Sequence, residues 1–211
     1  MMRHVVGAVL ILACGTIGVP QADAEDVYYG VLGGANFSTV VFTPDLEFDW
    51  EDGTSLTGGA FLGVDLGESL SVETRVTFVR SSAGLVAAAD GLRATGEAQV
   101  DYLSVPLLAR VRLPGHAVAP FLVAGAELGF KTGAQLRATI NGGTEDDPDF
   151  DESIASRHYS LSIGGGLEIP AGKITVILEG LYSHGLNDIN EGPEVEQAKI
   201  RGFRVTAGLR F

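Results

Sequence analysis

The chain ends in Gly202-Phe203-Arg204-Val205-Thr206-Ala207-Gly208-Leu209-Arg210-Phe211, a stretch in which two kinds of side chain alternate. Every second position is apolar: Phe203, Val205, Ala207, Leu209 and Phe211. The positions between them hold Gly, Arg and Thr. Because successive side chains of a β-strand point to opposite faces, the stretch predicts a strand with one apolar face and one face of small and charged residues.

The same alternation occurs in seven earlier segments, and no segment after residue 24 shows the 3.6-residue stripe of an amphipathic helix. The predicted strands cover residues 28–38, 59–66, 70–78, 103–112, 122–131, 159–169, 174–183 and 202–211. Short connections at residues 67–69, 114–119 and 170–173 alternate with long ones at residues 39–55, 80–100, 132–158 and 183–199. This spacing predicts an all-β fold, an eight-stranded antiparallel up-and-down barrel with short turns at one end and long connections at the other.

The two faces of these strands indicate which side meets lipid. One face of each strand is almost uniformly apolar, whereas the other is rich in Gly and Ser and carries isolated charges. A solvated surface is usually about a quarter to a third charged, so the second face fits the crowded lumen of a transmembrane barrel better than water. Its charges nearly balance, as buried charges require: Asp65, Glu73, Glu127, Glu168 and Glu179 against Arg75, Arg110, Arg112, Lys131, Arg204 and Arg210.

Aromatic residues near the strand ends predict interfacial girdles at the membrane surfaces. The candidates are Tyr28, Tyr29, Phe37, Phe78, Tyr102, Phe130, Tyr159, Tyr182, Phe203 and Phe211. Ordinary packing within the strands is an equally good explanation for any single one of them.

Composition supports the same picture. The 211 residues include 27 Asp and Glu against 14 Lys and Arg, which gives a net charge of −13 and argues against a nucleic-acid partner. Mean hydropathy is nevertheless positive, at +0.23, and 29 residues are Gly. The acidic residues fall mainly in the long connections, so we assign the negative charge to the end of the barrel that carries them.

Residues 1–24 are predicted to be a secretory signal peptide. Arg3 and His4 precede an apolar run, Pro20 ends it, and Ala22-Asp23-Ala24 forms a small-x-small cleavage pattern before Glu25. The apolar run is shorter than the ~20 residues of a membrane-spanning helix, which disfavours an anchor. Lipidation at Cys14 is a weaker alternative. The mature domain, residues 25–211, then contains no Cys and no disulfide.

Signals for catalysis or metal binding are weak. Asp147-x-Asp149-x-Asp151 has the start of a calcium loop, but Glu152 replaces its Gly and His158 its final Glu, so only loose binding of a divalent cation stays as a hypothesis. Ser183 with His184, and Ser153 with His158, are the nearest groupings to a hydrolase site. Gly164-Gly165-Gly166 lies within a predicted strand and is not a phosphate loop. We therefore assign no catalytic, cofactor-binding or metal residues and expect neither enzymatic activity nor a cofactor.

The last strand, closing on Phe211, resembles the sorting signal that the barrel-assembly machinery of the outer membrane reads. Residues 27–211 as a whole resemble the outer membrane protein beta-barrel domain families, PorT-like or OmpX/OmpW-like, which are often called porin-family proteins. The segments that resemble the PorT-like group are Tyr102-Leu103-Ser104-Val105-Pro106-Leu107-Leu108, Pro120-Phe121-Leu122-Val123-Ala124-Gly125 and Leu181-Tyr182-Ser183-His184-Gly185-Leu186-Asn187-Asp188-Ile189.

The resemblance implies a location in the outer membrane of a Gram-negative-type bacterium after signal cleavage. It also implies outer-membrane lipid, lipopolysaccharide and the assembly machinery as partners. Members differ in role, so three functions stay open. The first is a scaffold whose acidic loops contact an unidentified exterior partner. The second is a narrow pore for small solutes or ions, lined by Glu127 and Arg204. The third is a soluble ligand carrier of lipocalin type.

Overall fold

The structure, a computed structural model, consists of antiparallel strands. It describes residues 27–43, 50–89, 92–113, 117–140, 143–147, 154–188 and 197–211. The predicted signal peptide, residues 1–24, lies outside this part of the chain. No helix in the described ranges is long and apolar enough to cross a membrane. The strands are β1 (Val27–Thr43), β2 (Trp50–Asp65), β3 (Leu70–Ala89), β4 (Leu92–Arg112), β5 (Ala119–Ile140), β6 (Gly143–Asp147), β7 (Arg157–Ala171), β8 (Ile174–Gly185) and β9 (Gln197–Arg210).

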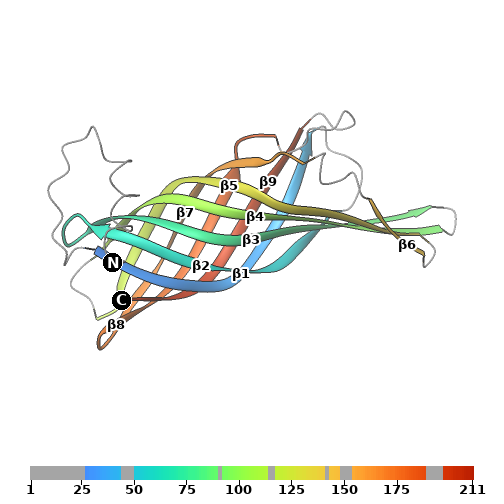
Figure 1. The fold of residues 1–211 in the computed structure, drawn as a ribbon. Coiled ribbons are helices and arrows are strands. Elements are labelled where there is room, and N and C mark those ends of the chain that lie inside the picture. The colour runs from blue at the N-terminus through green and yellow to red at the C-terminus, as the bar shows by residue number, and fades with distance from the viewer. Residues whose placement is uncertain are drawn as a thin grey trace, which may run out of the picture.

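Eight of these strands close into a barrel (Figure 1). The ring runs β1-β2-β3-β4-β5-β7-β8-β9 and closes where β9 pairs with β1. At one rim the Phe211 amide donates to the Tyr29 carbonyl over 2.8 Å, which joins the start of β1 to the end of the chain. Closure gives every strand of the ring two hydrogen-bonded neighbours, as lipid demands. The prediction of an eight-stranded antiparallel barrel is confirmed.

The turns between β2 and β3 and between β7 and β8 lie at the same rim as the start of β1 and the C-terminus. Gly67, between β2 and β3, and Gly172, between β7 and β8, have φ angles of 128° and 69°. Residues with a side chain rarely adopt such angles, so glycine is the natural residue at these two turns.

At the other rim, the strands continue well beyond the ~9–11 residues needed to span a bilayer. β3, β4 and β5 contain 20, 21 and 22 residues, and their outer parts form a sheet that projects from the barrel (Figure 1). Pairing continues as far as Ala89 with Leu92, and β6 lies along the end of β5. The assignment of residues 80–100 to a loop was therefore wrong, and parts of the other three long connections are also strand.

The physical reason is that backbone pairing does not require an apolar–polar alternation of side chains. Any two extended segments joined by a tight turn satisfy each other's amides and carbonyls. The residues between β3 and β4 are Asp90-Gly91, and those between β5 and β6 are Asn141-Gly142. Both dipeptides favour two-residue hairpin turns.

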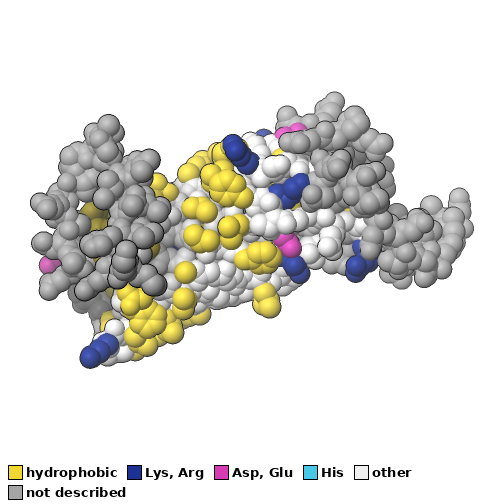
Figure 2. Space-filling view, viewed as in Figure 1, with side chains coloured by type: hydrophobic (Ala, Val, Ile, Leu, Met, Phe, Trp, Pro, Cys, Tyr) yellow, Lys and Arg dark blue, Asp and Glu magenta, His cyan; other side chains and the backbone are white. Residues whose placement is uncertain are grey.

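The outer wall of the barrel is apolar. Leu56, Leu122 and Ile163 are 81%, 70% and 63% exposed. Figure 2 shows hydrophobic side chains across the visible face of the barrel, with Lys and Arg to either side of them. An apolar exterior around a polar interior is typical of membrane-spanning barrels. In all eight strands of the ring, the predicted apolar face points outward and the predicted Gly- and charge-bearing face points inward.

The predicted aromatic girdle is confirmed in part. Eight of the ten candidates are exposed on the outer wall: Tyr29, Phe37, Phe78, Phe130, Tyr159, Tyr182, Phe203 and Phe211. Phe203 pairs in register with Phe37 on one side and with Tyr182 on the other, so three of them form a continuous aromatic row. Tyr28 and Tyr102 contradict the prediction, because each is only 3% exposed and lies inside the barrel. Each occupies a lumen-facing position of its strand, and a strand end does not override that alternation.

Candidate functional site: a polar network inside the barrel

Ionised side chains from six strands fill the half of the lumen nearest the chain ends. We call this set the inner network. It contains four arginines and four carboxylates, so its formal charges cancel. Its members are Asp65, Glu73, Arg75, Arg110, Arg112, Glu168, Glu179 and Arg210.

One ion pair crosses the full width of the barrel. Arg75 on β3 donates from both terminal nitrogens to the two carboxylate oxygens of Glu179 on β8, over 2.6 and 2.7 Å. Its Nε donates to Glu73 over 2.6 Å. In the ring of eight, β3 and β8 stand four positions apart and are therefore diametrically opposite. All three side chains are almost completely buried, so the geometry has the bidentate form that is strongest for an Arg–carboxylate pair.

Arg110 lies at the centre of the inner network. Its terminal nitrogens approach Glu73, Glu168 and Glu179 at 3.1, 2.9 and 3.4 Å. Its guanidinium also lies 4.3 Å from the centre of the Phe121 ring, a cation–π contact. The side chain is 1% exposed. It therefore links strands β3, β7 and β8 to its own strand, β4.

Arg112 and Arg210 close the inner network toward the rim that holds the chain ends. Arg112 contacts Glu168 at 2.6 Å and Asp65 at 3.2 Å, and Arg210 bonds the other oxygen of Asp65. The Arg210 guanidinium lies 3.8 Å from the centre of the Tyr28 ring, whose hydroxyl donates to Glu73 over 3.2 Å. Tyr28 is thus part of this site. The alternation of β1 already placed it on the Gly-bearing face, which is the signal that identifies it.

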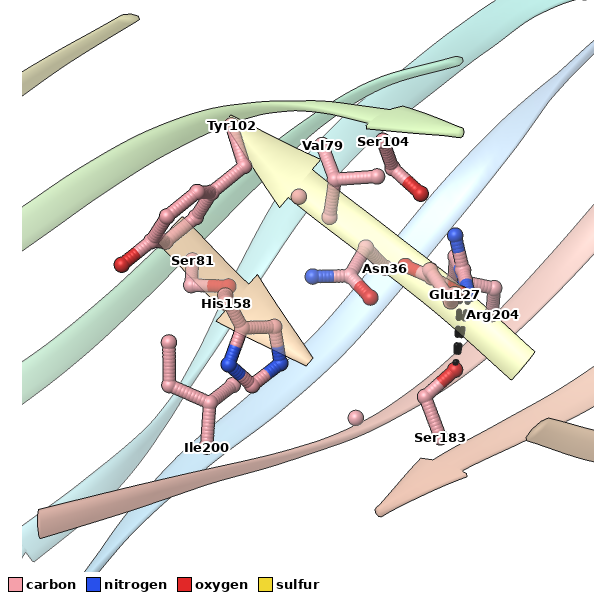
Figure 3. Close-up of a pocket in the computed structure, with 12 residues that line it drawn as sticks. Asn36, Val79, Ser81, Tyr102, Ser104, Glu127, His158, Ser183, Ile200 and Arg204 are labelled. Carbon is pink, nitrogen blue, oxygen red and sulfur yellow. Dashed lines mark hydrogen bonds and ion pairs between the residues drawn. The ribbon is translucent and has the colours of Figure 1, made fainter. Parts of the chain in front are cut away.

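A second, smaller group lies in the outer half of the lumen, where Glu127 on β5 pairs with Arg204 on β9. Arg204 also donates to the Ser183 hydroxyl over 2.7 Å (Figure 3). Ser162 donates to Glu127 over 3.1 Å. The sequence-based expectation of balanced lumen charges is confirmed, because each of the five acids contacts an arginine. The sixth base, Lys131, donates to the carbonyl of Ile154 over 2.9 Å.

The outer group borders a cavity of about 30 Å³, which Tyr102 and His158 also line. Their rings lie 5.6 Å apart. In the part of the chain that the structure describes, the Tyr102 hydroxyl and His158 Nδ1 are buried without a hydrogen-bond partner. A water molecule needs about 10–15 Å³, so the cavity has room for about two waters that would satisfy these atoms.

The two hydrolase-like groupings do not form a catalytic pair among the described residues. Ser183 points into the lumen, whereas His184 occupies the next position of β8 and lies on the opposite face. His158 is buried in the lumen, and Ser153 lies outside the described residues. Asp149 and Asp151 of the possible calcium loop also lie outside them. Within the described ranges, no group of three or more acidic, His or Cys side chains is arranged to hold a metal ion.

These features define the class: a small transmembrane β-barrel with an apolar outer wall and a lumen filled by ion pairs. Residues 21–191 match the family described as "Outer membrane protein beta-barrel domain". The chain belongs to this family, and membership places it in the outer membrane. A soluble carrier of lipocalin type is thereby ruled out, and the apolar outer wall conflicts with that alternative as well.

One of the similar solved structures is that of Ail, the attachment invasion locus protein of Yersinia pestis. Its sequence is 15% identical, the match covers 88% of this chain and 99% of that chain, and the TM-score is 0.44. Neisserial surface protein A has 13% identity, coverages of 87% and 95%, and a TM-score of 0.47. OprG from Pseudomonas aeruginosa has 12% identity, coverages of 87% and 95%, and a TM-score of 0.48. A search of curated proteins finds no match.

Proposed function

We propose that the protein is a non-conducting, non-catalytic scaffold of the outer membrane, which holds an interaction surface outside the cell. The observation that carries this proposal is the ion pair between Arg75 and Glu179, which crosses the diameter of the barrel. An eight-stranded barrel has a lumen only just filled by side chains, so a pair that reaches from wall to wall obstructs it.

The space inside the barrel supports the same view. Two cavities beside the inner network, both lined by Arg75 and Glu179, measure about 10 Å³ each. Each is the size of a single water molecule. A solute would have to break several buried ion pairs to pass, and each break leaves charges unpaired in a medium of low dielectric.

The projecting sheet supports the interaction role. Its hydrogen-bonded strands carry backbone far beyond the girdle. Among the described residues, β6 pairs with β5 alone, so no other described strand occupies its second edge, where an additional strand can pair. Adding a strand to such an edge is a common way to bind an extended peptide. β6 includes Glu145, Asp146 and Asp147, so a basic segment is the partner that its charge favours.

Planar-bilayer recording tests the proposal. We expect the wild-type protein to give no steady single-channel steps, because the ion pairs of the inner network obstruct its lumen. A heat-modifiable gel shift verifies that each protein is folded. Steady wild-type steps that change in Glu127→Gln or Arg204→Gln would instead establish the narrow pore.

The export signal has its own test. We expect mass spectrometry of the protein from outer-membrane fractions to show a mature chain that begins at Glu25, because Ala22 and Ala24 offer the small side chains that the peptidase requires. A mature chain that begins at Cys14 with an attached lipid would contradict this assignment.

A further inference from the structure

Basic residues lie just beyond the aromatic girdle, at the rim of the barrel that carries the projecting sheet. On four strands, the outward-facing residue two positions beyond a girdle aromatic is basic: Arg80 after Phe78, Arg157 beyond Tyr159, His184 after Tyr182 and Arg201 beyond Phe203. Two residues of strand span about 6–7 Å. Girdle aromatics lie at the level of the lipid headgroups, so these side chains reach the headgroup layer of the outer leaflet.

Three of the four lie on adjacent strands, β7, β8 and β9. His184 and Arg201 are directly paired across β8 and β9, and Lys199 is the next residue on the same face of β9. We call Arg157, His184, Lys199 and Arg201 the basic collar. Arg157 and Arg201 are exposed, and in the described part of the chain neither makes an ion pair. Every arginine of the inner network, by contrast, contacts a carboxylate.

Arg80, on the other side of the barrel, has its own counter-charge. Its guanidinium is 43% exposed and donates to both oxygens of Asp101, over 2.8 and 2.9 Å. This pair leaves little net charge at β3 and β4, so we exclude Arg80 from the basic collar.

The basic collar is exceptional for this molecule. The chain carries a net charge of −13, and its basic residues are outnumbered almost two to one. At the opposite rim, the described turns contain the exposed residues Glu68 and Lys173, whose charges cancel. The concentration of cations at one membrane surface is therefore a local feature and does not follow from overall composition.

We infer that the basic collar binds the phosphate groups of an anionic lipid in the outer leaflet. Arginine suits this ligand because its planar fork donates two parallel hydrogen bonds to a phosphate. The aromatic row of Phe37, Phe203 and Tyr182 directly below offers the apolar surface on which acyl chains pack. This surface is independent of whether the lumen conducts.

Calorimetric titration of the folded, detergent-solubilised protein with diphosphorylated lipid A tests the inference. Each surface cation contributes roughly fivefold to the affinity for an anionic lipid. We therefore expect Arg157→Gln/Arg201→Gln to raise the Kd about 25-fold. Lys173→Gln, which removes an exposed cation from the opposite rim, should leave the Kd unchanged. The wild-type protein should bind dephosphorylated lipid A more weakly than the double variant binds the phosphorylated form, because the double variant keeps Lys199 to attract the phosphates.

Three results would overturn the inference. The first is an unchanged Kd in the double variant whose folding the gel shift verifies. The second is an equal loss in Lys173→Gln, which would indicate a general effect of charge. The third is saturable binding of inorganic phosphate with the same dependence on Arg157 and Arg201, which would identify free anions and not lipid as the ligand.

Discussion

Arg75→Leu is expected to lower the free energy of unfolding by about 3–5 kcal/mol, the usual cost of removing one partner from a buried ion pair. The variant leaves the inner network with three arginines and four carboxylates. Glu179 then loses its two short hydrogen bonds, and Glu73 loses one. The side chains of Glu73 and Glu179 are only 1% and 2% exposed, so the uncompensated charge stays buried.

Urea unfolding in lipid vesicles, followed by the gel shift of the folded barrel, measures this loss. The double variant Arg75→Leu/Glu179→Leu restores equal numbers of charges and should be less destabilised than Arg75→Leu alone. Arg201→Gln, on the exposed outer wall, should change the free energy of unfolding by less than about 0.5 kcal/mol. If the loss of unfolding free energy in the double variant equals the sum of the losses in Arg75→Leu and in Glu179→Leu, charge balance is not what stabilises the lumen.

The sequence was sufficient to assign the two faces of every strand, because strand alternation has a period of two and lipid and lumen select opposite residue types. This rule located all the charges of the inner network before their contacts were known. It also contained the correct position of Tyr28, which shares its face with Gly30 and Asn36. The girdle prediction is wrong at Tyr28 and Tyr102 because the face of the strand, and not closeness to its end, decides whether a side chain points to lipid or to the lumen.

The projecting sheet was missed for a different reason. Alternating hydrophobicity does not indicate its strands, because the alternation fades where neither face has to be buried in lipid. The dipeptides Asp90-Gly91 and Asn141-Gly142 are strong hairpin signals in the sequence, and the residues that flank them, Ala89 with Leu92 and Ile140 with Gly143, are paired. The signal for both hairpins therefore lies in these turn residues and not in the periodicity of the strands.

The partners within the lumen could not be predicted from the sequence. Arg75 and Glu179 are 104 positions apart, and their contact depends on the order of the strands around the ring and on the stagger between them. The sequence establishes that charges on the inner face must be paired. Only the closed barrel determines which residues form each pair.

The high glycine content also has its explanation inside the barrel. Gly33 and Gly34 are neighbours on β1 and point to opposite faces. A Cβ added to Gly34 would overlap the Val205 carbonyl oxygen and lie 2.8 Å from the Thr206 Cα of β9. A Cβ added to Gly33 would meet nothing nearer than the Thr57 carbonyl oxygen at 3.8 Å. The lumen-facing glycine therefore permits a close approach of backbones that the lipid-facing one does not need.

Alanine at these two positions should act in opposite directions. Gly34→Ala is expected to lower the free energy of unfolding by about 1–3 kcal/mol, because backbone atoms of β9 must move to admit the methyl group. Gly33→Ala should raise it by about 0.4–1 kcal/mol, since alanine restricts the unfolded chain and its methyl group faces open space. Urea unfolding in the same vesicles compares two variants that differ only in the face of one strand. Equal effects at the two positions would mean that strand propensity, and not the crowding of the lumen, accounts for the glycines.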